Sequence, residues 1–501
     1  MTHHTGNRRN IFPQFGTGIA ICSSAVRTAG IFISAILLSG VCFAQPALVL
    51  SAEGGPPTTG VFVSGSGFPA STTVDIYFDT TELALAGTNG TGSFPGIKIR
   101  VPASALPGTH WITAAVANVT GDTAQAPFHV RTNWSQFRFT TNHSGLNPHE
   151  NVLSRTTVGD LGLRWSYSTV ATASSSPAVA NGVVYAGAQE DFNVHALNAT
   201  TGALLWQFTT GGYVNSSPAV VNKAVYVGSY DGNLYALYAA TGAVLWQFTT
   251  GGLVDSSPVV ANGGVYFGSS DHNVYALDAA TGAKLWQFTT GDEVDSSPAV
   301  ANGVVYVGSN DGNVYALGQG VKLWQFTTGG EVFSSPAVVD GVVYVGSFDN
   351  NVYALNATTG AKLWQFTTGG RVYTSPAVVD GVVYVGSDDK NVYALNAGTG
   401  AKLWQFTTGS YVESSPAVAN GVVYVGSWDY NVYGLNASTG AKLWQFTTGG
   451  EVTSSPAVAN GMVYVGSWDG NIYAFSTATT PAQSPGPPDP ATLRPNPGLG
   501  K

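Results

Sequence analysis

The sequence contains almost no cysteine and little charge. Both cysteines, Cys22 and Cys42, lie within the first 44 of the 501 residues. A chain that has lost those residues has no thiol for catalysis, metal binding or a disulfide, so packing must stabilise it. Charged residues make up only 9% of the sequence and aromatic residues 12%. Disordered chains show the opposite balance, and we therefore expect a folded protein.

Basic residues are also few, with 19 Lys and Arg against 28 Asp and Glu and a net charge of −9. Three of them, Arg8, Arg9 and Arg27, belong to the first 44 residues, which contain no acid. The acidic remainder repels phosphate backbones, which argues against a nucleic-acid partner. No nucleophile elbow, phosphate loop or His-Glu-x-x-His motif occurs. The abundant glycine (63 residues) and the many Val, Thr and Ser favour β-structure with tight turns.

Residues 1–44 are predicted to be an export signal. A basic stretch precedes an apolar run from Gly30 to Ala44, and small residues stand at the cleavage-determining positions. A membrane span needs about 20 apolar residues, so this run is short for one. An uncleaved anchor is the alternative, and Cys42 is a candidate lipid-attachment residue, although Val41 before it is bulky. We expect a mature chain without a membrane span, in the periplasm or at the cell surface, and a monomer.

Internal repetition decides the fold class. A Trp-Gln-Phe-Thr-Thr-Gly element recurs at intervals of 38 to 41 residues and is preceded by a divergent copy at Trp165. The eight tryptophans are Trp165, Trp206, Trp246, Trp286, Trp324, Trp364, Trp404 and Trp444. A Ser-Pro dipeptide followed by two apolar residues also recurs eight times, from Pro177 to Pro456. We expect each tryptophan to pack between neighbouring repeats.

Each repeat divides into four short strands, A to D. In one copy these are 335–338, 342–345, 351–355 and 363–368, with glycine turns between A and B and between C and D. Four antiparallel strands per 40 residues are typical of a β-propeller blade. Eight A-B-C sets are followed by only seven D strands. The segment around Trp165 supplies the eighth, which predicts an eight-bladed ring closed by pairing of its two ends.

The remaining segments suggest further parts. Residues 45–131 alternate apolar and polar positions and predict an immunoglobulin-like β-sandwich that lacks the Cys-Trp-Cys pattern of antibody domains. Residues 132–160 form a linker that leads into the propeller, which fills 161–476. Residues 477–501 are Pro-rich and are predicted to be disordered. The fold class is thus all-β, an eight-bladed propeller preceded by a sandwich.

The repeats resemble the pyrroloquinoline-quinone-type (PQQ-like) β-propeller family. The segment from Ala354 to Trp364 matches that family's tryptophan-docking motif, and the lead-in at 134–138 and 143–148 is similar to that of such proteins. The resemblance implies either a quinoprotein dehydrogenase with the quinone and calcium at the ring centre, or a non-enzymatic binding propeller similar to the barrel-assembly lipoprotein.

The absence of cysteine after residue 44, of a Cys-x-x-Cys-His haem site and of long insertions in the blades favours the non-enzymatic branch. We therefore expect no catalytic residue, cofactor or metal. The Asp-x-Asn elements between strands B and C are interpreted as turns, in which Asp and Asn bond their own backbone.

The repeats differ from one another mainly at two places, the D-to-A connection and the B-to-C turn, which emerge on the same face of an up-and-down blade. Grouped aromatic side chains on a surface often mark contact sites. The predicted partner-binding face comprises Tyr213, Asp255, Glu293, Asp295, Glu331, Phe333, Arg371, Tyr373, Tyr411, Glu413, Glu451, Tyr230, Phe348, Trp428, Tyr430 and Trp468.

The predicted function is a non-catalytic exported scaffold that binds a protein, a peptide or a glycan through this face. Neutral drift of exposed loops is the alternative explanation of the variation. A PQQ- and calcium-dependent dehydrogenase is one alternative function. A cell-surface carbohydrate-binding or adhesion protein is another, favoured if Trp428, Tyr430 and Trp468 are coplanar and exposed.

Overall fold

The computed structural model describes residues 45–116, 122–477, 487–490 and 493. The predicted export signal and most of the predicted tail lie outside these residues. Gln45–Lys501 forms one compact unit. Within the described residues no helix is long and apolar enough to cross a membrane.

The first part of this unit contains two β-sheets around one apolar core. The smaller sheet has the order β1-β3-β6 and the larger the order β2-β8-β7-β4-β5. Val61, Ile76 and Ile112 from both sheets are fully buried in the shared core. The strands are β1 (Ala47–Leu50), β2 (Gly54–Gly55), β3 (Gly60–Ser66), β4 (Thr73–Phe78), β5 (Thr81–Gly87), β6 (Phe94–Arg100), β7 (Gly108–Val116) and β8 (Thr123–Val130). The immunoglobulin-like topology stays a prediction.

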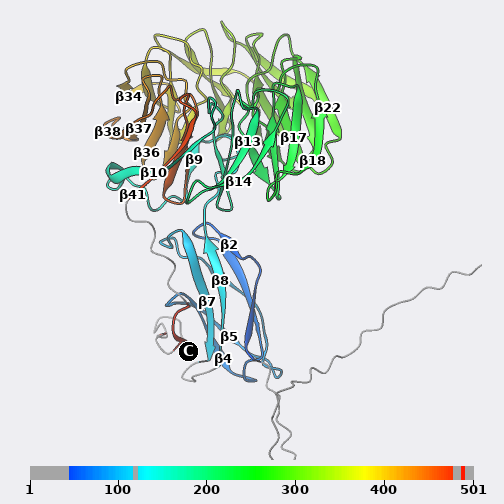
Figure 1. The fold of residues 1–501 in the computed structure, drawn as a ribbon, viewed down its shortest axis with the longest axis vertical. Helices are drawn as coiled ribbons and strands as arrows, with labels where there is room; N and C mark the ends of the chain where they lie inside the picture. The colour runs from blue at the N-terminus through cyan, green and yellow to red at the C-terminus, as the bar shows by residue number, and fades with distance from the viewer. Residues whose placement is uncertain (1–44, 117–121, 478–486, 491–492, 494–501) are drawn as a thin grey trace, which may run out of the picture. The chain divides into compact units, whose positions relative to one another are not determined.

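The second part is a ring of antiparallel sheets, seen at the top of Figure 1. In the described chain eight sheets carry the repeats, which confirms the predicted propeller. Blade 5 is representative, with β27 (Ala337–Val339), β28 (Val342–Gly346), β29 (Asn351–Asn356) and β30 (Lys362–Thr367) in that order. The innermost strand begins after Pro336, two residues later than the predicted start at residue 335, because proline has no N–H for the ladder.

The other blades repeat this pattern. Blades 1 to 3 comprise β11 (Ala178–Ala180), β12 (Val183–Gly187), β13 (Asn193–Asn198), β14 (Leu204–Thr209), β15 (Ala219–Val221), β16 (Ala224–Gly228), β17 (Asn233–Tyr238), β18 (Val244–Thr249), β19 (Val259–Ala261), β20 (Gly264–Gly268), β21 (Asn273–Asp278) and β22 (Lys284–Thr289). Blades 4, 6 and 7 comprise β23 (Ala299–Ala301), β24 (Val304–Gly308), β25 (Asn313–Gly318), β26 (Val321–Thr327), β31 (Ala377–Val379), β32 (Val382–Gly386), β33 (Asn391–Asn396), β34 (Lys402–Thr407), β35 (Ala417–Ala419), β36 (Val422–Gly426), β37 (Asn431–Asn436) and β38 (Lys442–Thr447).

The last blade closes the ring as predicted. It joins β39 (Ala457–Ala459), β40 (Met462–Gly466) and β41 (Asn471–Thr477) to β10 (Leu161–Ser168), which follows the short 3₁₀ helix η1 (Val158–Asp160). Strands β10 and β41 are antiparallel and lie side by side in Figure 1. Pairing between the two ends of the array removes the open sheet edges that would otherwise promote aggregation.

The cores of the ring are the seams between adjacent blades. At the seam of blades 5 and 6, the Trp364 indole N–H donates to the Ala397 carbonyl at 2.8 Å, and the Tyr344 hydroxyl donates to the same oxygen at 3.2 Å. The indole also packs on Gly400, where a Cβ would lie 2.7 Å from the ring. Gly400 has φ +71°, which glycine adopts at no steric cost. The Thr-Gly turn of one blade therefore forms the seat for the tryptophan of the preceding blade.

Candidate functional site

The central channel of the ring is filled from one end by residues 134–149, here called the channel segment. Its backbone carbonyls accept hydrogen bonds from the innermost strands, such as Ser135 from Val220 at 2.6 Å and Asn142 from Val338 at 2.8 Å. All eight blades are contacted, seven through the N–H of a valine and the eighth by the Asn147 amide, which donates to the Val458 carbonyl. The short strand β9 (Leu146–Asn147) also extends blade 7 in parallel with β35. The channel segment was predicted only as a linker.

The physical reason for this arrangement is the inner edge of the ring. Within its blade, every innermost strand pairs on one side only, and its other side presents N–H groups to the channel. Buried backbone donors need partners, and the channel segment supplies them. Its irregular path requires positive φ at Arg138, Phe139, His143 and Gly145. Six of the eight residues that make these bonds are Ser, Asn, Thr or Gly, and the other two are Trp134 and Gln136. This composition indicates irregular backbone but does not reveal where it binds.

Next to the channel segment along the axis of the ring, eight serines form a closed circle of hydrogen bonds around the channel. The backbone N–H of one serine donates to the side-chain oxygen of its counterpart in the next blade, at 2.9–3.1 Å, around the full circle. The eight serines are Ser176, Ser217, Ser257, Ser297, Ser335, Ser375, Ser415 and Ser455. This ring explains the Ser-Pro element of the repeats, which the sequence alone identified only as a landmark.

The open part of the channel is a cavity of about 230 Å³ at the end opposite the channel segment, here called the cup. Phe137 of the channel segment and the serine ring line its deep part. Its other lining side chains come from the variable positions just before Ser-Ser-Pro, together with Gln189 and Trp468 of B-to-C turns. These variable residues are Ser174, Asn215, Asp255, Asp295, Phe333, Tyr373, Glu413 and Thr453. Six of the sixteen predicted residues therefore line the cup, namely Asp255, Asp295, Phe333, Tyr373, Glu413 and Trp468.

The two variable loops of each blade are joined by backbone. In blades 2 to 8 the first residue of the B-to-C turn donates its N–H to a carbonyl of the D-to-A connection at 2.9–3.0 Å, as from Tyr230 to Tyr213 and from Trp468 to Glu451. Both loops therefore lie on the same face, as the strand order requires. This placement locates the predicted residues but does not test whether they bind a partner.

Side chains at positions fifteen residues apart also pair within a blade. The Asn215 amide donates to the Tyr230 hydroxyl at 2.8 Å, and the Trp428 indole donates to Glu413 at 3.0 Å. In blade 5 the same two positions hold stacked Phe333 and Phe348 rings, 4.6 Å apart. The two positions therefore match chemically within a blade, either as a donor with an acceptor or as two stacked rings. A change at one position is accompanied by a matching change at the other.

The surroundings of the carboxyl groups in the cup disfavour their charged form. Burial, and then the nearby Asp295 carboxylate, raise the pKa of Asp255 to about 7. Burial, and then Asp388, raise the pKa of Glu413 to about 7 against the opposing effects of Trp428 and Arg371. Burial also raises the pKa of Asp295, opposed by hydrogen bonds from Asn310 and Ser270. The cup therefore concentrates negative charge that its surroundings compensate only in part.

Aromatic side chains form three groups around the cup. Tyr213 contacts the rings of Phe192 and Tyr230. Tyr373 stacks on Phe333, 5.5 Å between centroids. Trp428 contacts Tyr411 at 5.6 Å and Trp468 at 5.7 Å, with the two indole planes inclined by 45°.

Other predicted residues lie around this rim. Arg371 lies over the Phe348 ring at 5.0 Å. Glu293, Glu331 and Tyr430 are exposed and Glu451 is half-buried. Among the described residues, no ring contact involves Tyr430, so the structure does not join it to the tryptophan pair.

The aspartates of the B-to-C turns are engaged structurally. In blade 2 one Asp231 oxygen accepts the Asn233 N–H at 2.9 Å, while the other accepts the Gly211 N–H and the Tyr235 hydroxyl, both at 2.7 Å. In blade 1 His195 replaces this tyrosine and contacts Asp191 at 2.7 Å. The turn interpretation of the Asp-x-Asn elements is therefore supported by specific bonds. Within the described chain no group of three His, Cys, Asp or Glu side chains is placed to hold a metal ion.

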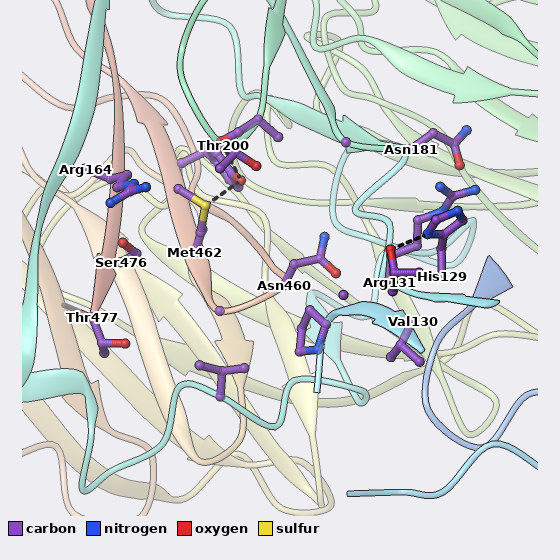
Figure 2. A pocket seen from close by; sticks show the side chains of 18 residues that line it. His129, Val130, Arg131, Arg164, Asn181, Thr200, Asn460, Met462, Ser476 and Thr477 are labelled. Atoms are coloured by element: carbon purple, nitrogen blue, oxygen red, sulfur yellow. Dashed lines mark hydrogen bonds between the residues drawn. The ribbon is translucent and has the colours of Figure 1, made fainter. Parts of the chain in front are cut away.

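A second hollow differs chemically from the cup. Figure 2 shows propeller residues that line it, among them Arg164, Asn181, Thr200, Asn460 and Met462. They come from A-to-B and C-to-D turns and from neighbouring strands of the first and last blades. The described lining contains no carboxylate. The convergence of acidic and aromatic side chains is therefore a property of the cup.

Comparisons with known proteins agree with this fold. A family profile described as the beta-propeller of beta-alanine-activating enzyme matches residues 173–417, and one described as outer membrane protein assembly factor BamB matches residues 388–483. No curated protein matches the sequence.

Solved structures with similar folds include BamB and several dehydrogenases. BamB from Moraxella catarrhalis is 22% identical, with a TM-score of 0.55 over 64% of this chain and 98% of that chain. Quinohemoprotein alcohol dehydrogenase from Comamonas testosteroni is 18% identical, with a TM-score of 0.59 over 70% and 81%. A europium-containing methanol dehydrogenase is 15% identical, with a TM-score of 0.61 over 69% and 98%. At these identities the likeness concerns the fold, since one fold hosts many functions. From its repeats, its fold and these matches, the chain belongs to the PQQ-like β-propeller family.

Proposed function

We propose that this chain is an exported, non-catalytic propeller that acts as a binding scaffold and holds a protein or peptide partner at its cup and rim. One observation carries the proposal. The channel segment closes the ring from one side, and the side chains that vary between otherwise uniform blades converge at the opposite opening. The similarity to an outer membrane protein assembly factor favours export and a protein partner. A closed ring with packed seams gives such loops a rigid support.

The residues of the cup do not fit pyrroloquinoline quinone. That group is a tricarboxylate, whereas the cup presents Asp255, Asp295 and Glu413, and like charges repel. Arg371 is the one cationic side chain of the sixteen proposed residues, and it lies on the rim over Phe348. The cup is also smaller than the 300–1,000 Å³ of ordinary small-molecule sites. These observations favour the scaffold over the dehydrogenase.

A glycan-binding function is less well supported. Flat aromatic platforms suit sugar rings, and the carbohydrate alternative depends on coplanar tryptophans. The Trp428 and Trp468 planes are inclined by 45°, and the indole of each donates to a neighbouring side chain, Glu413 or Thr453. The two rings therefore form no flat platform for a sugar, and a protein or peptide partner is the better proposal.

Site-specific photo-cross-linking tests the proposal directly. A benzophenone amino acid replaces Tyr430 on the proposed face, and in a matched control it replaces Tyr238 at the C-to-D turn. Both tyrosines are exposed, by 45% and 38%. In cells that naturally produce the protein, we expect discrete cross-linked species from position 430 and none from position 238. Equal patterns at both positions, or none at 430, would contradict the proposal.

A further inference from the structure

The face around the cup has an acidic sector and aromatic sectors. Blades 3 and 4 supply four carboxylates and no aromatic side chain at the proposed positions, and the D-to-A connection of blade 5 adds a fifth carboxylate. The five are Asp255, Asp292, Glu293, Asp295 and Glu331. His272 lies 4.0 Å from Asp292, and Arg371 and Lys390 belong to blade 6. The negative potential over this sector is therefore only weakly opposed by the face itself.

Several acceptor atoms at this face have no donor. The Asp388 Oδ1 and Asn310 Oδ1 atoms are buried and lack a hydrogen-bond partner within the described chain. Asn310 uses its amide N–H to donate to Asp295 at 2.8 Å, which leaves its oxygen free. A buried acceptor without a donor destabilises the folded chain, so a ligand that brings N–H groups to these atoms would be favoured.

The aromatic groups form the second part of the proposed recognition surface, beside the acidic sector. Tyr373, Tyr411 and Trp468 each expose 37–42% of their surface while the rings remain stacked or tilted against neighbours. Exposed aromatic rings attract both apolar side chains and cations. The chain contains an internal example, since the Arg371 guanidinium lies over the Phe348 ring.

The size of the cup limits what can enter it. A volume of about 230 Å³ accommodates one long side chain, and the serine ring with Phe137 closes the deep end. A whole folded element cannot enter. The partner must therefore insert a side chain and spread its neighbouring residues over the rim.

Building on the proposed function, we propose that the partner is a basic peptide loop whose lysine or arginine enters the cup between Asp255, Asp295 and Glu413. Apolar residues on either side of that cation contact the three aromatic groups. Charge complementarity selects this class of partner over acidic or neutral peptides. The raised pKa values of the cup carboxyls support it, because an inserted cation relieves their mutual repulsion and the cost of their burial.

The test uses the full chain and a fluorescein-labelled peptide, Leu-Lys-Gly-Lys-Leu, capped at both ends, with binding followed by fluorescence anisotropy. The comparison peptide carries N-acetyl-lysine at both lysine positions and so loses only the charge. We expect acetylation to weaken binding at least tenfold. Spermine, a free polycation, should compete at least tenfold less well than the unlabelled lysine peptide, because it has no apolar residues for the rim. Equal affinity for both peptides would overturn the proposal, and spermine as effective as the peptide would overturn its peptide part.

A triple variant tests whether the carboxylates of the cup cause the binding of the lysine peptide. Asp255→Asn, Asp295→Asn and Glu413→Gln together remove the cup charges but keep amide oxygens in place, and Asn already stands at the equivalent position 215. The control, Asp340→Asn with Asp380→Asn, removes charge from A-to-B turns, where Asn occupies the same position in other blades. We expect at least a tenfold loss for the lysine peptide in the triple variant and less than twofold in the control. Wild-type affinity in a triple variant with an unchanged circular dichroism spectrum would overturn the proposal.

The outcomes separate the two proposals. If position 430 cross-links to a partner while the lysine and acetyl-lysine peptides bind alike, the scaffold function stands and the cationic partner is wrong. If neither experiment gives a signal, both are wrong. If the triple variant does not fold, the peptide pair on the wild-type chain still decides the question.

Discussion

Removing charge from the cup should stabilise the protein at neutral and alkaline pH. The variant Asp255→Asn with Glu413→Gln replaces two carboxyls whose folded-state pKa is raised to about 7. A raised pKa means that the folded state binds the proton more tightly than the unfolded state does. The stabilisation is therefore complete below pH 4, near the unfolded pKa, and is lost as the pH rises through 7.

The magnitude follows from the size of the shift. Each carboxyl moves by about three pKa units, and one unit corresponds to about 1.4 kcal/mol, which sets a ceiling of about 4 kcal/mol per group. Both side chains are partly exposed, so solvent screening reduces this to about 1–2 kcal/mol each. We expect the double variant to exceed the wild type by about 2–4 kcal/mol in free energy of unfolding at pH 8. At pH 4.5 most of that difference should be absent.

Urea unfolding followed by circular dichroism at pH 4.5 and pH 8 measures both values. The other titratable or charged groups near the two carboxyls are present in both chains, and those coupled to the two carboxyls lose that interaction in the double variant. They are Asp295, Asp388, Tyr230, Tyr373, Arg371 and Glu331. The pair Asp340→Asn with Asp380→Asn, on the opposite turns, is the control for removing two carboxyls outside the cup. A double variant that is less stable than the wild type at pH 8, or equally stabilised at both pH values, would refute the electrostatic reasoning.

Three further changes probe the ring, the rim and the channel. Gly360→Ala should destabilise the protein more than Gly341→Ala does, by about 1–3 kcal/mol in thermal unfolding. Both glycines have positive φ, but only at position 360 would a Cβ clash with the neighbouring indole, at 2.7 Å. Equal losses in the two variants would argue against the packing of the tryptophan on the glycine turn. Trp428→Ala with Trp468→Ala should weaken partner binding at least tenfold while the melting temperature changes little, and unaltered binding would count against the rim. Arg138→Met should raise the free energy of unfolding by about 1–2 kcal/mol, because Arg138 is 2% exposed and burial lowers its pKa to about 9. Its Nε and Nη2 atoms also lack hydrogen-bond partners among the described residues. A fall in stability would show that its bond to the Pro416 carbonyl matters more. Calorimetric titration with pyrroloquinoline quinone and calcium should give no heat, whereas tight one-to-one binding would favour the dehydrogenase.

The sequence alone was sufficient to predict the ring, because every blade repeats the same local sequence pattern. Ser-Pro starts an inner strand, glycine turns separate the strands, and the position of Trp165 reveals the closing strand. Identical short-range patterns fold identically, so eight copies give eight blades. The grouping of variable loops on one face also followed from strand order, because an up-and-down blade leaves no other arrangement.

Only the tertiary structure decided what happens along the axis of the ring. The channel segment bonds to all eight blades, and these contacts join residues up to 311 positions apart, in the case of Asn147 and Val458. No local periodicity encodes such contacts, since they depend on the inner edges of all blades meeting at once. The same is true of the cup, where Asp255, Asp295 and Glu413 converge because the ring closes. The sequence determined which residues vary, and the closure of the ring decided that their charges share one cavity.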